Sequence, residues 1–246
     1  MKIASWTVLV SAAFLLSGCL QISDNGFFGR TIHGSGVRAT ETRAVSGFDQ
    51  VGVSGSGQIT IIQGDEESLT IEADDNFLPL IKSEVVNGKL RIGPERVSLR
   101  ASQPIRYKLK LKRLTALSLS GSLAAEADSL KTETLTVSIS GSGKVRLARL
   151  EADDFKVRIS GSGDLNLAGK VTHQELRISG SGDYRAAELD SQHAEVHISG
   201  SGDALLTAQQ TLDVHISGSG KVQYYGHPSI SKSISGSGSL RRLGGR

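Results

Sequence analysis

The chain has 246 residues, only 4% of them aromatic, and its 28 Lys and Arg residues stand against 25 Asp and Glu residues. These nearly balanced charges, with no dense basic run, argue against nucleic acid as a partner. The single cysteine excludes a disulfide within the chain. The length suffices for one elongated domain behind an export signal.

Residues 1–18 have the pattern of an export signal, with Lys2 for charge and an apolar run over 4–16. That run is too short for a lasting membrane span. Leu16-Ser17-Gly18-Cys19 resembles the lipobox of bacterial lipoproteins, in which the cysteine is acylated. Because the lone cysteine lies at the cleavage point, Cys19 is the predicted lipid attachment site. Leu20 follows it rather than aspartate, which by the same resemblance favours the outer membrane over the inner.

Residues 19–42 are polar and glycine-bearing without sustained periodicity, and this composition predicts a flexible tether behind the lipidated cysteine. A single β-solenoid domain is predicted over 43–246. Its first half, 43–119, is irregular, and residues 120–240 are regular.

The irregular half nevertheless carries clear local signals. Asn87-Gly88 predicts a two-residue hairpin, and residues 74–79 predict a turn or a short helical excursion. Period-two alternation predicts strands over 58–63, 68–72, 89–92 and 106–111. This half forms either the first wide turns of the solenoid, with loops inserted, or a small antiparallel cap.

Seven copies of Ser-Gly-Ser-Gly punctuate the chain, and a degenerate copy at Ser120 has Leu123 in place of the second glycine. From Ser120 onward the copies recur every 18 to 20 residues. Apolar residues alternate on both sides of each copy, which predicts an all-β protein, a parallel β-helix with turns of that length. The full copies begin at Ser54, Ser140, Ser160, Ser179, Ser199, Ser217 and Ser235.

Each copy is predicted to form a corner between two strands. Glycine suits a sharp bend because a Cβ would clash where φ is positive, and serine can hydrogen-bond the local backbone. Stacking turns about 4.8 Å apart would align the residue before each motif into an internal aliphatic ladder. That ladder contains Leu119, Ile139, Ile159, Ile178, Ile198, Ile216 and Ile234.

Three other interpretations of the motif are less favoured. A flexible linker would not have a hydrophobic strand next to every copy. A phosphate-binding loop would continue into a helix and show the G-x-x-x-x-G-K-[ST] pattern, which no copy does. A calcium-binding roll has half this spacing, and the acidic positions Asp164, Asp183 and Asp203 are Lys144 and Lys221 in other turns.

Outward positions before each corner form two columns. The simplest interpretation is a solvated face whose charges pair weakly. A sharper one takes Glu195, His197, Asp213 and His215 as zinc ligands, but an open flat surface supplies no cavity. The columns are Ser138, Arg158, Arg177, His197, His215, Ser233 and Thr136, Lys156, Glu175, Glu195, Asp213, Ser231.

The acidic row Asp164, Asp183 and Asp203 raises the possibility of a polysaccharide lyase or hydrolase. The turns are short and nearly equal, whereas an enzyme groove needs long loops to wall its substrate. The sequence therefore predicts no catalytic residue, no cofactor and no metal site.

Several segments in order resemble one bacterial family, the "putative auto-transporter adhesin head domain", or GIN domain. The resemblance covers residues 43–240 and implies a right-handed β-helix in secreted or lipid-anchored proteins, with adhesion but no defined ligand. It offers no catalytic residues, and Leu123 departs from its motif. The matching pieces are 43–51, 53–57, 59–64, 87–92 and 114–122, followed by the Ser-Gly-Ser-Gly series.

These features predict a non-enzymatic exported lipoprotein that is held to the membrane by its lipid and binds a glycan, a protein or a second copy. The alternative is a periplasm-facing scaffold of the cell envelope, and the oligomeric state stays open. At the C-terminal end, Lys232 enters the inward column, Pro228 interrupts the preceding strand, and Arg241, Arg242 and Arg246 follow the last motif. They predict a cap against further strand addition, the alternative being a frayed terminus.

Overall fold

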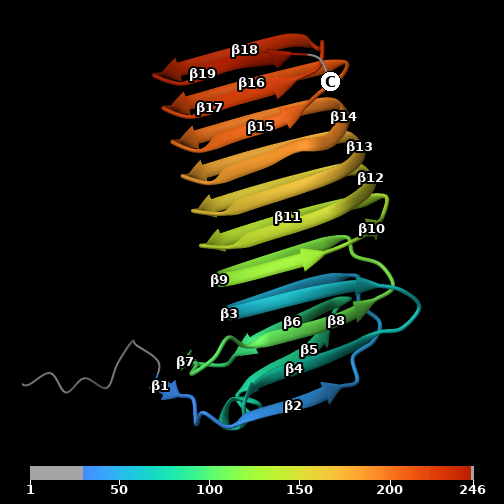
Figure 1. The fold of residues 1–246 in the computed structure, drawn as a ribbon, viewed down its shortest axis with the longest axis vertical. Helices are drawn as coiled ribbons and strands as arrows, with labels where there is room; N and C mark the ends of the chain where they lie inside the picture. Colours follow the sequence, from blue (N-terminus) through green and yellow to red (C-terminus); the bar gives the residue numbers. More distant parts are fainter. Residues whose placement is uncertain (1–29, 245–246) are drawn as a thin grey trace, which may run out of the picture.

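The computed structural model describes residues 30–244. The protein is almost all β, with 74% of residues in strands that wind into a β-solenoid of about six turns (Figure 1). The predicted signal peptide and Cys19 lie outside the described residues. Within 30–244, no helix is long and apolar enough to cross a membrane.

The regular stack runs from β9 to the C-terminal end. Each turn pairs with the next in parallel, so that Ser140, Ser160 and Ser179 lie side by side. The same register confirms the predicted inward and outward columns. The strands are β9 (Ala116–Ala127), β10 (Leu130–Lys131), β11 (Thr134–Gly141), β12 (Lys144–Gly161), β13 (Asp164–Gly180), β14 (Asp183–Gly200), β15 (Asp203–Thr207), β16 (Thr211–Gly218), β17 (Lys221–Tyr225), β18 (Ser229–Gly236) and β19 (Ser239–Gly244).

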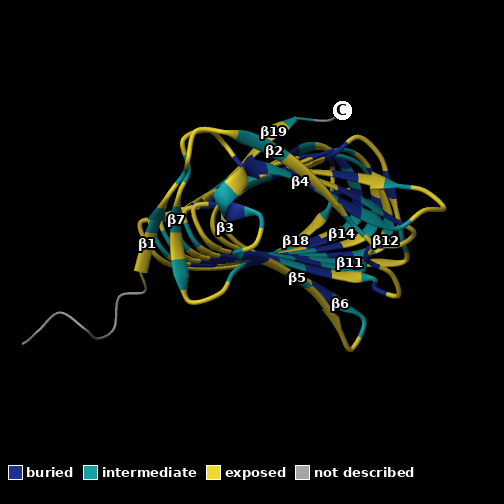
Figure 2. Cartoon of the chain, turned by 90° about the horizontal axis from the view of Figure 1, so that it is seen from below, coloured by how far each residue is buried: buried dark blue, intermediate teal, exposed yellow. Residues whose placement is uncertain are grey.

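Each turn has three walls, which are visible when the stack is viewed along its length (Figure 2). In β12, residues 154–161 precede the corner, 144–147 follow a corner, and 150–152 form a short connection; each segment pairs with the next turn. We call the corresponding walls A, B and C. The register shifts between Leu147 and Leu150, where wall B ends.

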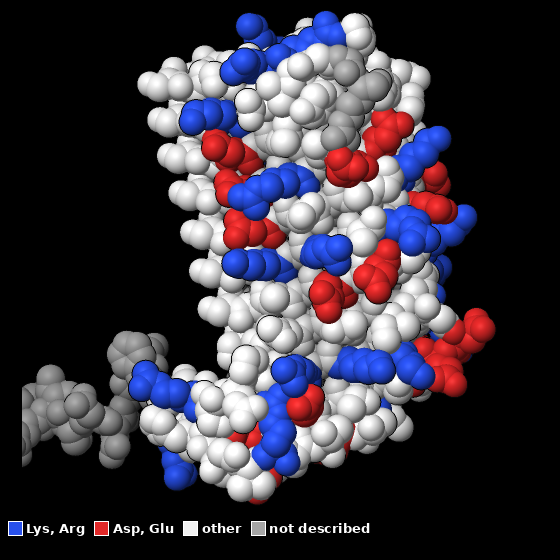
Figure 3. Space-filling view, viewed as in Figure 1, with Lys and Arg blue, Asp and Glu red and all other residues white. Residues whose placement is uncertain are grey.

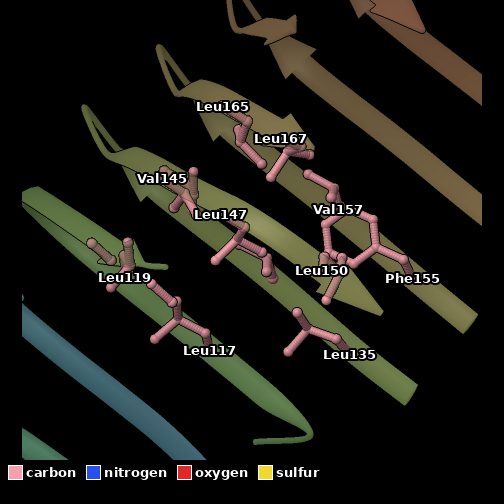
Figure 4. Close-up of a cluster of buried hydrophobic side chains, with 14 of the residues drawn as sticks. Leu117, Leu119, Leu135, Val145, Leu147, Leu150, Phe155, Val157, Leu165 and Leu167 are labelled. Carbon is pink, nitrogen blue, oxygen red and sulfur yellow. The ribbon is translucent and has the colours of Figure 1, made fainter. Parts of the chain in front are cut away.

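The interior is filled by the inward residues of all three walls. Val145 and Leu147 from wall B meet Leu150 from wall C and Phe155 and Val157 from wall A, and all five are buried (Figure 4). Each such side chain contributes about 1.5–3 kcal/mol by leaving water. The stack therefore has one continuous aliphatic core.

The corners confirm the predicted need for glycine at the first glycine of each motif. Gly161 has φ of +119° and Gly180 of +128°. The second glycine has a different reason: a Cβ on Gly182 would lie 2.9 Å from Ile159 Cγ2 and 3.0 Å from the Gly163 oxygen. In the regular turns the first glycine is thus required by conformation and the second by close packing against the preceding turn.

The predicted role of the motif serines is wrong in detail. Across the described chain, the only motif serine whose hydroxyl reaches a backbone carbonyl is Ser54, at 3.5 Å from the Ile92 oxygen. The backbone of the motif makes the bonds instead, since the Ser162 amide donates to the Gly141 oxygen at 2.9 Å. In the regular corners of the described chain, the backbone hydrogen bonds between turns occupy the carbonyl oxygens, and the serine hydroxyls bond none of them.

The N-terminal portion combines both predicted alternatives. β3 pairs in parallel with β9, so that Ser54 lies beside Ser120 and Gly57 beside Leu123, and β3 is a true turn of the stack. Beyond it, β4 runs antiparallel to β2 and β8, and β5 runs antiparallel to β6. These strands close the N-terminal end of the stack as a cap (Figure 1). The elements are β1 (Arg30–His33), β2 (Arg38–Arg43), β3 (Gln50–Gln63), β4 (Ser68–Asp74), η1 (Asp75–Phe77), β5 (Ile81–Val86), β6 (Lys89–Pro94), β7 (Val97–Arg100) and β8 (Arg106–Leu111).

The local signals of this portion are confirmed. The β5–β6 hairpin turns at Asn87 and Gly88, whose φ values of 53° and 75° are both positive, as a two-residue primed turn requires. The short helical excursion is the 3₁₀ turn η1, and all four predicted strands are present.

The predicted tether ends earlier than residue 42. β1 pairs with β7 and β2 pairs with β4, so residues 30–42 belong largely to the folded domain. Asp74, only 1% exposed, accepts hydrogen bonds from the Gly36 amide at 3.0 Å and from the Ser102 amide and hydroxyl. The hydrogen bonds to Ser102, above all, hold the pKa of Asp74 below its usual value. Polar bonds, rather than an apolar pattern, fix this segment.

The C-terminal end is ordered strand, not a frayed terminus. β18 pairs with β16 in register, which places Lys232 beside Val214. All eight residues of β18 are exposed, including Ile230 and Ile234 at 45% and 36%, although both continue columns that are buried in the preceding turns. The last turn therefore presents interior aliphatic positions to solvent, with a lysine between them.

A small polar network is buried inside the stack. The Tyr184 hydroxyl donates to Gln174 Oε1 at 2.9 Å, and Gln174 Nε2 donates to Ser191 Oγ at 2.6 Å. Ser191 Oγ donates in turn to the Thr207 oxygen at 2.7 Å. Burial raises the pKa of Tyr184, so its hydroxyl stays a donor. The network joins three successive turns through the core.

We expect Tyr184→Phe to destabilise the protein by about 1–3 kcal/mol, because it leaves the buried Gln174 carbonyl without a donor. Tyr224→Phe is the control, since its hydroxyl has no hydrogen-bond partner in the described part of the chain and should cost under about 0.5 kcal/mol. Urea unfolding of both variants measures the difference. Equal midpoints would show that the network does not contribute to stability.

Candidate functional site

The outer face of wall A carries the two predicted columns. Arg177 Nε donates to Glu175 Oε1 at 2.6 Å, and Lys156 Nζ lies 3.9 Å from Glu175 Oε2. The hydrogen bond from Arg177, above all, lowers the pKa of Glu175. This part of the face is a solvated, paired surface, as the simpler interpretation predicted.

The four residues of the zinc hypothesis do come together, but not as a metal site. The rings of His197 and His215 stack face to face with centroids 4.8 Å apart. His197 Nε2 lies 2.5 Å from Glu195 Oε1, and His215 Nε2 lies 3.2 Å from Asp213 Oδ1. Each imidazole therefore faces the carboxylate of its own strand. Among residues 30–244, no group of three or more His, Cys, Asp or Glu is placed to hold a metal ion.

A second histidine pair was not anticipated from the sequence. His173 and His193 stack with centroids 4.9 Å apart, and His193 Nδ1 lies 2.8 Å from Thr211 Oγ1. The signal was available, because Asp154, His173 and His193 share the next outward column of wall A.

The predicted acidic row lies on wall B beside the corners. Asp164, Asp183 and Asp203 are in register, with Lys144 and Lys221 at its ends. The row is partly neutralised from its own strands as well, because Arg185 Nη2 donates to Asp183 Oδ2 at 2.6 Å. Charges of both signs are intermixed over the visible face of the molecule (Figure 3).

A groove of about 840 Å³ lies on wall B where the cap meets the stack. Its floor comes from β3 and β9, and its sides come from β4 and β8 below and from β12 and β13 above. Thr60 on β3 lies beside Glu126 on β9 and donates to its Oε1 at 3.2 Å. Ala124 adds a small side chain next to Gln58.

Cations rim this groove on both sides. Arg106 and Lys108 project from β8, and Lys144 and Arg146 project from β12, with β3 and β9 between them. Arg106 Nη1 lies 3.3 Å from Glu72 Oε1, and Lys144 Nζ lies 3.9 Å from Asp164 Oδ2. No ion pair within residues 30–244 involves Lys108 or Arg146, so their charges are available to a ligand.

The sequence did not reveal the groove. Its residues come from segments as far apart as Thr40 and Arg185, and they meet only because β8 and β9 both pair with β3 across the irregular half. The sequence pattern that pointed to the groove was limited to two pairs of outward cations, at 106 and 108 on one strand and at 144 and 146 on another.

The fold resembles solved structures over most of its length. A protein from Parabacteroides distasonis, described as a "putative lipid binding protein", is 27% identical with a TM-score of 0.72, over 87% of this chain and 100% of that one. A "putative adhesin" from Bacteroides fragilis is 24% identical with a TM-score of 0.80, over 86% and 100%. Another from Parabacteroides merdae is 19% identical with a TM-score of 0.70, over 87% and 100%.

No curated protein matches this chain. A family profile does match, over residues 47–228, which include β3 to β8, most of the groove and most of the stack. The stacked Ser-Gly-Ser-Gly corners and the matched range agree with the resemblance seen in the sequence, and the chain therefore belongs to the family described as "putative auto-transporter adhesin, head GIN domain".

Proposed function

We propose that the protein is a non-enzymatic lipoprotein of the cell envelope that binds an extended ligand on the outer walls of its solenoid. The groove on wall B is the observation that carries this proposal, because it offers unpaired cations and polar side chains on a rigid β surface. Membership of an adhesin-type family supports a surface or exported location.

Binding is favoured over catalysis by the arrangement of the charged groups. The acidic row is matched by Lys144, Arg185 and Lys221. On wall A, Glu175 and Glu195 are likewise bound by Arg177 and His197. A glycosidase needs a pair of carboxylates with distinct protonation states around a cleft, whereas these groups form paired surface rows.

We expect lipid attachment at Cys19. Cells grown with a palmitate analogue should label the wild-type protein, and Cys19→Ala should lose the label and the membrane association, because several acyl chains are needed for stable anchoring. Ser17→Ala is a matched control in the same segment and should keep the label. An unlabelled wild type, or a labelled Cys19→Ala variant, would contradict the anchor.

Whether the solenoid faces the cell exterior or the periplasm is tested on intact cells. Protease added outside should remove the solenoid if it faces the exterior, whereas cleavage only after the outer membrane is opened would favour the periplasm-facing scaffold. A periplasmic marker protein serves as the control for membrane integrity.

A further inference from the structure

We propose that the groove between the cap and the stack binds an acidic polysaccharide, one whose sugar units carry carboxylate groups. This inference rests on the proposed binding function and names the ligand class. It is carried by the charge and geometry of the wall B residues described above.

The lining of the groove has an excess of positive charge. Five cations face it against three carboxylates, Glu72, Glu126 and Asp164, so the lining carries two more positive than negative groups. The cations are Arg106, Lys108, Lys144, Arg146 and Arg185. Glu72 is already bound by Arg38 at 2.8 Å and by Arg106, and these bonds lower its pKa. The net field at the rims therefore favours an anionic ligand.

The two free cations are placed to hold one chain from both sides. Lys108 lies beside Thr60, Thr60 beside Glu126, and Glu126 beside Arg146. Three strand spacings separate Lys108 from Arg146, about 14 Å at about 4.8 Å per strand. A ligand lying along the strands would have a cation row on each side and Gln58, Thr60, Ala124 and Glu126 beneath it.

Polar side chains on the floor and one side of the groove suit sugar hydroxyls. Gln58, Thr60 and Asn166 are exposed and line the groove, and among them only Thr60 has its polar atom engaged, with Glu126. Amide groups offer both a donor and an acceptor, as a hydroxyl-rich ligand requires. These polar side chains match a hydroxyl-bearing backbone, with Glu126 on the floor held by Thr60, and the cations of the rims match acidic substituents.

Single-stranded nucleic acid fits this surface poorly. Among residues 30–244, the only aromatic residue lining the groove is Tyr107, which is 2% exposed and whose pKa is raised to about 12 by burial. Binding to single strands relies on bases stacking on exposed aromatic rings. The positive rims without an aromatic platform therefore favour an acidic glycan.

The test uses the purified full-length protein with its anchor in detergent micelles. We expect polygalacturonate to bind, dextran to bind at least about tenfold more weakly, and the affinity for polygalacturonate to fall as salt screens the rims. Lys108→Gln combined with Arg146→Gln should weaken polygalacturonate binding about tenfold. Lys112→Gln combined with Arg149→Gln removes the same charge from exposed positions outside the groove and should leave binding unchanged. Circular dichroism verifies that each variant is folded.

Each other outcome overturns the inference. Equal binding of dextran, or equal weakening by the two double variants, would show that the rims do not select the ligand. Equal binding of poly-glutamate or of DNA would show that sugar is not recognised. Absence of polygalacturonate binding would overturn the ligand class while leaving the envelope function, which the Cys19 and intact-cell experiments test separately.

Discussion

Gly161→Val and Gly180→Val are expected to destabilise the solenoid by about 4 kcal/mol or more, enough to abolish folding in many domains of this size. Both glycines have positive φ, where valine is strained. A Cβ would also lie 2.6 Å from the Gly141 oxygen in the first case and 2.5 Å from the Gly161 oxygen in the second. Those oxygens accept the hydrogen bonds that join successive turns, so they cannot move without loss of the ladder.

The matched controls are Ser162→Ala and Ser181→Ala, at the next position of the same corners. Both serines are exposed and bond the neighbouring turn through their backbone amides, which alanine retains. They should cost under about 0.5 kcal/mol. Thermal unfolding measured by circular dichroism compares the two sets, and similar melting temperatures for glycine and serine variants would disprove the account of the corner.

Removing the residues that protect the C-terminal strand edge should convert a soluble protein into end-to-end oligomers. The variant combines Lys232→Val, deletion of Pro228 and truncation after Leu240. It removes the cation between the exposed Ile230 and Ile234, and it removes Arg241 and Arg242 from the last strand. Unpaired strand edges with apolar side chains recruit further strands, and charged residues normally prevent this. Light scattering at increasing protein concentration measures the association.

Ser233→Val is the control for this prediction. It adds the same apolar side chain to the same edge strand, but in the outward column beside His215 rather than in the inward one. It should stay monodisperse. If the combined variant also stays monodisperse, Lys232 and the arginines do not protect the end.

The sequence predicted the stack well because burial alternates with period two on walls A and B. Val137, Val157 and Leu176 face inward while Ser138, Arg158 and Arg177 face out, so register and columns follow from the motif spacing alone. The alternation on wall C was too short to be recognised in the sequence, since only two to four residues per turn pair there. Most of β2 was wrongly predicted to be tether. The chain just before β2 is held by polar hydrogen bonds, such as that from the Gly36 amide to Asp74, and such bonds leave no periodic pattern in the sequence.

The candidate site was harder to predict than the fold. The acidic row and both charge columns follow from the repeats, but the groove depends on β3 pairing with β8 and β9 across an intervening segment of irregular spacing. The position of Gly57 beside Leu123 shows that the degenerate motif belongs next to the first full one, a contact between residues 66 positions apart. Spacing alone does not reveal such a pairing.

The position of the cap fixes which end of the molecule would face the membrane. The described chain begins at the cap, and β18 and β19 lie at the opposite end (Figure 1). Arg30 lies eleven residue steps along the chain from the proposed anchor at Cys19, and an extended chain spans at most about 3.6 Å per step, or about 40 Å. With such an anchor, the groove next to the cap would lie toward the lipid surface, and the exposed aliphatic residues of β18 would lie at the end farther from it.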